Sequence, residues 1–256
     1  MDRKNEYIAV FDSGVGGISV LRQLRRELPQ ERFLYFGDSA NAPYGERSVE
    51  QVRSLTLAAA KMLLNRGVKA LVVACNTATA AAIELLRQEY PGEIIIGIEP
   101  AVKLAASHFP RGRIGVMATR VTLQQERFDD LLARHGGGAE VARIPAPGLV
   151  ELIEQGRADS AETQALLTDI LAPWRGKLDA LVLGCTHYPF VKNTIARILG
   201  EETELLDGSL GTARETKRRL AEAGLLRSGT GEVLIEDSAP GDEVLRLARR
   251  LLDRPE

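Results

Sequence analysis

Hydrophobic residues gather in short runs that are separated by longer segments with helical periodicity. Nearly all-apolar runs of this length are typical of parallel strands covered on both faces. Alternation of such strands with helices predicts a parallel, doubly wound α/β fold. The predicted strands are Tyr7–Phe11, Arg32–Phe36, Ala70–Ala74, Ile94–Ile98, Arg113–Met117, Glu140–Ile144, Leu178–Leu183 and Glu204–Leu206, with an edge strand at Glu232–Ile235. The predicted helices include Ile18–Leu28, Val49–Asn65, Ala78–Leu86, Leu123–Arg134, Gly211–Ala223 and Gly241–Leu252.

One sequence pattern occurs twice. The stretch ALVVACNT at 70–77 resembles ALVLGCTH at 180–187, and each places a cysteine just after an apolar strand. The pattern predicts two related α/β domains, at 1–98 plus 207–256 and at 99–206. Ligands of such folds bind at the carboxyl ends of the strands, so we expect an active site in the cleft between the domains.

Composition narrows the classes of function. With 5% aromatic residues and a net charge of -2, the chain has neither the stacking rings nor the basic surface of a nucleic-acid-binding protein. No apolar run reaches the roughly 18 residues of a membrane span, and no signal-peptide core precedes the first strand. We therefore expect a cytoplasmic enzyme whose two cysteines are reduced thiols.

Cys75 and Cys185 are the candidate chemical groups. Each is followed by polar residues and a predicted helix, where the positive end of the helix dipole stabilises a thiolate. The pKa of a free thiol is about 8.5, so a modest lowering of that pKa makes the thiol a usable base near neutral pH. Buried inert cysteines and a disulfide are the alternatives. A metal site is disfavoured because His187 is the only histidine near either cysteine.

Two polar loops follow the first two strands. The segment 12–17, DSGVGG, resembles an anion-binding turn, or a dinucleotide loop with Asp38 as the ribose-binding acid, but its glycine spacing fails the GxGxxG pattern. The segment 37–45, GDSANAPYG, is rich in turn-forming residues. Both loops leave the same predicted strand edge as Cys75.

Four motifs together resemble the glutamate racemase family: Asp12-Ser13-Gly14, Pro43-Tyr44-Gly45, 74–79 (ACNTAT) and 184–189 (GCTHYP). The resemblance extends from about Ile8 to Asp207. It implies racemisation of glutamate without a cofactor or metal, a homodimer, and a supply of D-glutamate for peptidoglycan. The segment 144–148 (IPAPG) and the run after Thr119 depart from the family pattern.

The resemblance also implies a role for each site residue. Cys75, assisted by Asp12, would act on the D-glutamate side, and Cys185, assisted by His187, on the L-glutamate side. Glu154 matches a glutamate that the family keeps near the second cysteine. The implied substrate-binding residues are Asp12, Ser13, Tyr44, Gly45, Asn76, Thr77, Thr119, Thr122, Thr186 and His187.

Other functions fit part of the pattern. A racemase of the same superfamily acting on aspartate or a hydantoin would keep the mechanism and change the substrate. A Cys–His acyl-transfer enzyme using Cys185 and His187 would leave Cys75 without a role. A non-catalytic amino-acid-binding module would need the polar loops but not the thiols.

Overall fold

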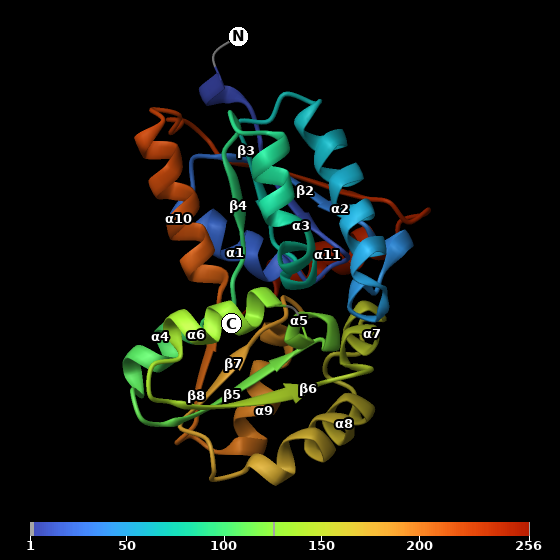
Figure 1. Ribbon diagram of the computed structural model, residues 1–256. Helices are drawn as coiled ribbons and strands as arrows, with labels where there is room; N and C mark the ends of the chain where they lie inside the picture. The colour runs from blue at the N-terminus through green and yellow to red at the C-terminus, as the bar shows by residue number, and fades with distance from the viewer. Residues whose placement is uncertain (1–2, 125, 256) are drawn as a thin grey trace. The chain divides into compact units, whose positions relative to one another are not determined.

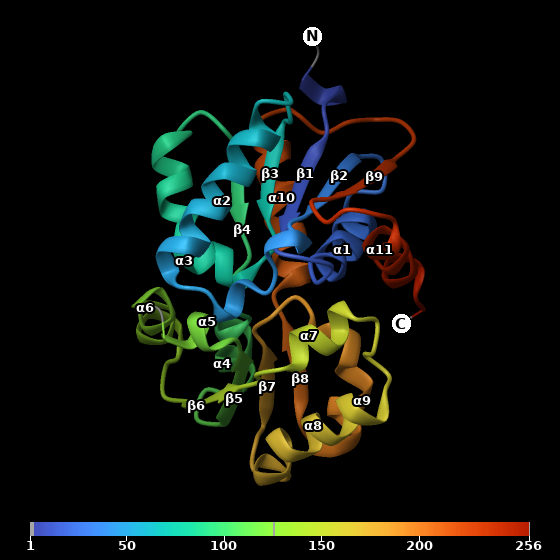
Figure 2. The same cartoon turned by 90° about the vertical axis from the view of Figure 1, so that its right-hand side faces the viewer.

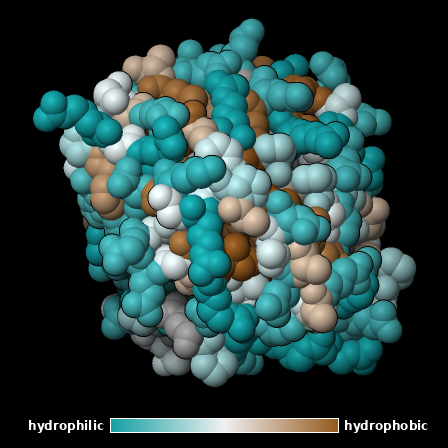
Figure 3. Space-filling model, turned by 90° about the horizontal axis from the view of Figure 1, so that it is seen from below, coloured by the Kyte–Doolittle hydropathy of each residue, from teal (hydrophilic) through white to brown (hydrophobic). Residues whose placement is uncertain are grey.

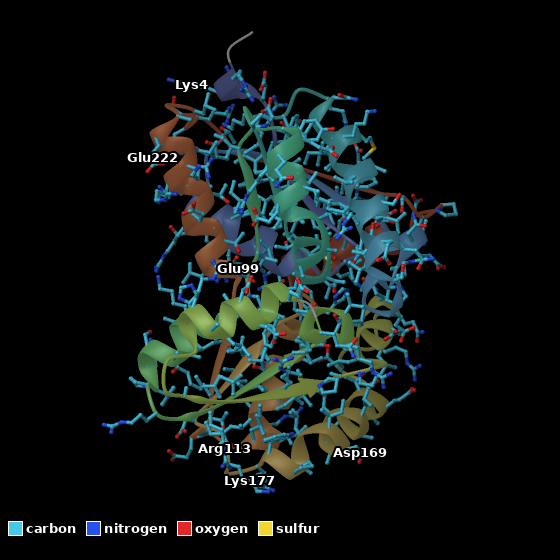
Figure 4. All side chains as sticks on the ribbon, viewed as in Figure 1. Lys4, Glu99, Arg113, Asp169, Lys177 and Glu222 are labelled. Atoms are coloured by element: carbon cyan, nitrogen blue, oxygen red, sulfur yellow. The ribbon has the colours of Figure 1, made fainter. Side chains whose placement is uncertain are left out.

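A computed structural model describes residues 3–124 and 126–255. The chain divides into two compact units, Met1–Glu99 with Ser209–Glu256, and Pro100–Gly208. The first crossing between them follows Glu99, which is labelled in Figure 4. The domain limits predicted from the sequence stay a prediction, because compact packing alone does not show that a segment folds independently.

The first unit is built on a five-stranded sheet in the order β4-β3-β1-β2-β9. Every neighbouring pair in it is parallel. Its strands are β1 (Ile8–Asp12), β2 (Arg32–Gly37), β3 (Ala70–Val73), β4 (Ile95–Gly97) and β9 (Glu232–Asp237).

Helices cover both faces of this sheet (Figures 1 and 2). On one face α1 packs against α10 and α11, and on the other α2 packs against α3. The bounds are α1 (Ile18–Glu27), α2 (Val49–Leu64), α3 (Asn76–Glu89), α10 (Ser209–Glu222) and α11 (Glu243–Asp253). The short 3-10 helices of this unit are Arg3–Asn5, Ser39–Asn41 and Tyr44–Glu46.

An apolar core lies between the sheet and the α2–α3 layer. Phe11, Leu71 and Val73 of the sheet are fully buried against Leu63 of α2 and Leu86 of α3. Cys75 belongs to the same cluster, so packing fixes the point at which the chain leaves β3.

The second unit has a four-stranded parallel sheet in the order β6-β5-β7-β8. Figure 2 shows α4, α5 and α6 on one side of it and α7, α8 and α9 on the other. The strands are β5 (Arg113–Ala118), β6 (Glu140–Pro145), β7 (Ala180–Leu183) and β8 (Glu204–Asp207). The helices are α4 (Val102–His108), α5 (Arg120–Gln124), α6 (Glu126–His135), α7 (Leu149–Glu154), α8 (Ala161–Leu171) and α9 (Lys192–Leu199), with 3-10 helices at Ala172–Trp174 and Tyr188–Val191.

The two sheets repeat one strand order. The series β4-β3-β1-β2 of the first unit corresponds to β8-β7-β5-β6 of the second. The cysteine-bearing strands β3 and β7 therefore occupy equivalent places, each beside the first strand of its unit. This agreement supports the internal repeat inferred from the sequence and confirms the predicted parallel α/β class.

The predicted elements agree with the structure to within about two residues at most ends. The last strand is longer than expected: it reaches Asp237 and pairs with β2 along its whole length. The predicted helix Leu123–Arg134 corresponds to the end of α5 and most of α6, on either side of Gln125, which lies outside the described residues.

The face in Figure 3 is covered mainly by hydrophilic side chains, with hydrophobic residues in small separate areas between them. Among the described residues, no helix combines the length and the apolar character needed to cross a membrane.

A buried ion pair in the first unit holds the N-terminal segment and the segment that follows α10. Lys69 and Glu31 have side chains that are 0% and 2% exposed, with 2.5 Å between Nζ and Oε2. Lys69 also donates to the carbonyl oxygens of Lys4 and Leu225, and Glu31 accepts from the backbone N–H of Arg227. All the groups are thus hydrogen-bonded, as burial of charge requires.

We predict that Lys69→Met lowers the free energy of unfolding by about 3–5 kcal/mol, because it leaves the Glu31 carboxylate buried without its cation. Urea denaturation measures the loss. The control is Arg218→Met, which removes exposed ion pairs to Glu215 and Glu222 and should change stability little. A Lys69→Met loss no larger than that of the control would contradict the prediction.

Candidate active site

Cys75 lies at the junction of β3 and α3. Its backbone is extended, at φ -73° and ψ 120°, and it is the residue that caps α3. The sulfur accepts a hydrogen bond from the backbone N–H of Ala78 at 3.4 Å and lies 3.5 Å from the hydroxyl oxygen of Ser13. The side chain is 5% exposed. A first-turn N–H and the helix dipole both favour a thiolate at this sulfur, as the sequence predicted.

The neighbouring strand β1 ends in a tight polar turn. Asp12 is fully buried, and its carboxylate accepts a hydrogen bond from the N–H of Gly14 at 3.0 Å. The hydroxyl of Tyr35 donates to the carbonyl oxygen of Gly14 at 2.5 Å. These bonds hold the turn that presents Ser13 to Cys75. The sequence analysis did not single out Tyr35, because the bond joins β2 to the turn after β1, and these segments are 21 residues apart in the chain.

Asn76 stands out in the first turn of α3. The residue is 6% exposed, and its Oδ1 is the one buried side-chain oxygen or nitrogen within residues 3–124 and 126–255 that lacks a hydrogen-bond partner. A buried hydrogen-bond acceptor that has no donor lowers the stability of the ligand-free protein. Thr77 beside it is also buried, while Thr79 donates to the carbonyl oxygen of Val73 and ties α3 to β3.

Tyr44 and Asp38 form a buried pair in the loop after β2. The Tyr44 hydroxyl donates to Oδ2 of Asp38 at 2.6 Å, and the Nδ2 of Asn41 donates to the same carboxylate. Burial, followed by the bond to Asp38, raises the pKa of Tyr44, so the phenol stays protonated. Gly45 follows in the 3-10 helix Tyr44–Glu46. The structure thus gives the Asp38 carboxylate two partners within its own loop.

The second unit holds a chain of three titratable groups. The sulfur of Cys185 lies 3.6 Å from Nδ1 of His187, and Nε2 of His187 lies 2.6 Å from Oε1 of Glu154. Cys185 follows β7 and is 7% exposed, and His187 is 2% exposed. Glu154 is the last residue of α7, which begins after Gly148 in the left-handed region at φ 80°, where glycine is favoured.

His187 is set to carry a positive charge. Burial alone would lower its pKa, but the hydrogen bonds to Cys185 and then to Glu154 raise the pKa well above its usual value. An imidazolium between a thiol and a carboxylate can exchange a proton with the sulfur while the carboxylate balances the charge. Next along the chain, burial and the charge of Cys185 hold the pKa of Tyr188 well above its usual range.

One expectation about Cys185 was wrong. The sequence predicted a helix N-terminus at both thiols, but Cys185 is followed by a turn, the 3-10 helix Tyr188–Val191 and only then α9. Pro189 opens the 3-10 segment and not an α-helix. The helix dipole therefore acts on the sulfur of Cys75. At Cys185 the polar group beside the sulfur is instead the imidazole of His187.

The remaining predicted residues of the second unit lie at the same edge of its sheet. Thr119 follows β5, and its hydroxyl lies 3.0 Å from that of Thr122 at the start of α5. Thr186 is buried between Cys185 and His187. Arg113 and Lys177, labelled in Figure 4, mark the opposite, amino-terminal edge of this sheet.

The structure thus groups the predicted residues into two clusters, one in each unit. Asp12, Ser13, Tyr44, Gly45, Cys75, Asn76 and Thr77 belong to the first unit, and Thr119, Thr122, Glu154, Cys185, Thr186 and His187 to the second. Most of these residues follow the carboxyl ends of parallel strands, where ligands of such sheets bind, whereas Glu154 comes from the end of α7.

A separate cavity of about 540 Å³ contains none of these residues. It lies at the amino ends of β2 and β9, and Arg22, Arg25 and Arg26 of α1 contribute to its wall. Because it opens at the edge of the sheet opposite Cys75, we do not assign it to the candidate site.

We predict that an NMR titration of the imidazole protons shows His187 with a pKa above the usual value of about 6.5. Glu154→Gln should lower this pKa, since the amide cannot balance the charge, and should leave His108 and His135 unchanged as internal controls. Because folding raises the pKa, protonation of His187 contributes stability that is full below about pH 6.5 and is lost as pH rises through the folded pKa. A His187 that titrates at or below about 6.5 would contradict the assignment.

Comparison with known proteins shows which family this chain resembles. Residues 16–216 match the family model Asp/Glu/Hydantoin racemase. The chain is 43% identical over 256 residues to the glutamate racemase of Clostridium botulinum, covering 99% of each protein.

Two solved structures are similar over nearly the whole length. A glutamate racemase of Bacillus anthracis has a TM-score of 0.89 at 33% identity, covering 98% of this chain and 95% of that one. A glutamate racemase of Francisella tularensis in complex with D-glutamate has a TM-score of 0.86 at 29% identity, with the same coverage. The chain therefore belongs to the Asp/Glu/Hydantoin racemase family.

Proposed function

We propose that this racemase interconverts L-glutamate and D-glutamate without a cofactor, with Cys75 and Cys185 as the two acid–base groups. One observation carries the proposal. The two thiols follow equivalent strands of a repeated sheet, one in each unit, and each contacts groups suited to proton transfer. We infer that the substrate is glutamate because the similar proteins are glutamate racemases.

Inversion of a stereocentre by proton exchange needs a base on one face of the α-carbon and an acid on the other. Near-attack contacts of about 3–3.5 Å on each face would separate the two sulfurs by roughly 7 Å when substrate is bound. A disulfide needs about 2 Å, so a working enzyme keeps both thiols reduced. Cys75 and Cys185 are not joined by a disulfide in the structure.

The proton steps balance in both directions. With L-glutamate, the Cys185 thiolate removes the α-proton and the Cys75 thiol delivers a proton to the opposite face. With D-glutamate, the Cys75 thiolate is the base and the Cys185 thiol is the acid. Asp12 assists on the Cys75 side, and His187, balanced by Glu154, assists at Cys185.

The polar residues around the thiols would bind the α-amino and carboxylate groups. The Oδ1 of Asn76, which lacks a donor, suits an ammonium group. Ser13, Thr77 and Thr186 offer hydroxyl groups to a carboxylate or to the charge that develops on it. Tyr44, Gly45, Thr119 and Thr122 complete the proposed binding set, together with Asp12 and His187.

In the cell, this activity would supply D-glutamate for peptidoglycan. We propose that the enzyme acts in the cytoplasm, as a homodimer, which is what resemblance to the family implies. Two reduced thiols suit a reducing compartment.

We predict that wild type racemises each glutamate enantiomer in deuterated water without added cofactor, and that Cys75→Ser and Cys185→Ser each abolish net racemisation. Circular dichroism follows inversion, and NMR follows loss of the α-proton. Any exchange that survives should be one-sided: Cys185→Ser with D-glutamate and Cys75→Ser with L-glutamate. His108→Asn, an exposed histidine of the second unit, is the control and should keep full activity.

The other outcomes separate the alternatives. Racemisation of aspartate alone would keep the mechanism and overturn the substrate. Racemisation that persists in Cys75→Ser and is lost in Cys185→Ser would overturn the two-thiol mechanism and leave Cys185 with His187 as the acting pair. Binding of glutamate without exchange would favour an amino-acid-binding module.

We also predict opposite effects of Asn76→Ala on binding and on stability. The KM for glutamate should rise about tenfold, since a hydrogen bond to the charged ammonium is lost. The empty protein should be at least as stable as wild type, because the substitution removes a buried acceptor that has no donor. Thermal unfolding and initial-rate kinetics measure the two effects. Asn193→Ala, on the exposed surface of α9, is the matched control. A destabilised protein with unchanged KM would contradict the role.

A further inference from the structure

We propose that Asp237, in the C-terminal strand β9, is a positioning residue for substrate binding, because it holds the loop that carries Tyr44. The inference rests on the proposed function, in which Tyr44 and Gly45 contact the substrate. The sequence analysis predicted an edge strand and a helix in this C-terminal segment and assigned it no site residue.

The end of β9 lies beside the start of that loop. Gly37, the last residue of β2, pairs with Asp237, and the N–H of Ser238 donates to the carbonyl oxygen of Gly37 at 2.9 Å. A Cβ on Gly37 would lie 2.8 Å from the carbonyl oxygen of Gly14 and would also meet the Asp237 carboxylate. The absence of a side chain at 37 thus lets β9, the loop and the 12–17 turn come together.

Two successive residues of β9 and its extension hold two successive residues of the loop. The hydroxyl of Ser39 donates to Oδ2 of Asp237 at 2.7 Å, and the N–H of Ala40 donates to the hydroxyl oxygen of Ser238 at 3.0 Å. The other carboxylate oxygen of Asp237 accepts from the N–H of Ala239, which fixes its rotamer. Both contacts to the loop span 198 residues of chain.

The bonds continue from Ser39 to Tyr44. Asp38 precedes Ser39, and its carboxylate accepts from the Tyr44 hydroxyl at 2.6 Å. Its N–H donates to the carbonyl oxygen of Asp12, which places the loop at the end of β1. Arg47 closes the far end by donating to the carbonyl oxygen of Asn41. Tyr44 itself is 1% exposed and packs near Phe11.

This arrangement differs from ordinary support of the core. Asp237 is half-buried, Ser238 and Ala40 are exposed, and none of them belongs to the apolar cluster of the unit. Loss of the Asp237 contact should therefore release the loop while the sheet stays folded. Substrate binding must then order the loop, and the entropy lost in doing so weakens binding. The KM for glutamate therefore rises.

The test is a double-mutant cycle of Asp237→Ala and Ser39→Ala in the full chain. Each single variant should raise the KM for glutamate about fivefold, with kcat within about twofold of wild type, since one hydrogen bond is lost. The double variant should be no worse than either single variant, because both remove the same bond. Glu236→Ala is the matched control: it lies on the same strand, pairs with Arg66 and should leave KM unchanged.

Hydrogen exchange of the backbone amides at 38–47 provides a readout that does not depend on turnover. Exchange should be about fivefold faster in Asp237→Ala and in Ser39→Ala, and unchanged in Glu236→Ala. Unchanged exchange in the two loop variants, or additive effects on KM, would overturn the inference. A wild type that does not racemise glutamate would instead overturn the proposed function and leave the exchange test standing.

Discussion

In both sheets every strand runs parallel to its neighbours, so each strand needs a crossover that starts at its carboxyl end. That constraint gathers the segments after β1, β2 and β3 at one edge of the first sheet, and those after β5 and β7 at one edge of the second. The polar turns, the loop that carries Tyr44 and the thiols all lie there. The apolar strands beneath them can then be buried on both faces, while the polar residues stay at the strand ends.

The two thiols are equivalent in topology but differ in their surroundings. Cys75 has a backbone N–H of α3 and the Ser13 hydroxyl, which are fixed dipoles without net charge. Cys185 has an imidazole whose pKa is raised, backed by the Glu154 carboxylate. The repeated sheet therefore gives the two thiols equivalent places in the topology, while the local sequence gives each thiol a different polar environment.

The sequence predicted the strands, the paired cysteines and most cluster residues, because these have local signals: apolar runs, turn formers and recognisable motifs. It missed the 3-10 segment after Cys185, since Pro189 suits a short turn as well as an α-helix. The sequence also did not predict the hydrogen bond between Tyr44 and Asp38, and it assigned the C-terminal segment no role near the candidate site. The contacts of Tyr35 with Gly14 and of Asp237 with Ser39 join segments far apart in the chain, and no periodicity reports them.

The central claim is that the two thiols act on one α-carbon. A crystal structure of the protein with D-glutamate tests it most directly. The account predicts the α-carbon between the sulfurs of Cys75 and Cys185, at roughly 3–4 Å from each and on opposite faces. It also predicts that the ammonium group donates to Oδ1 of Asn76. A ligand whose α-carbon reaches only one sulfur, or a complex with both sulfurs on the same face, would contradict the account.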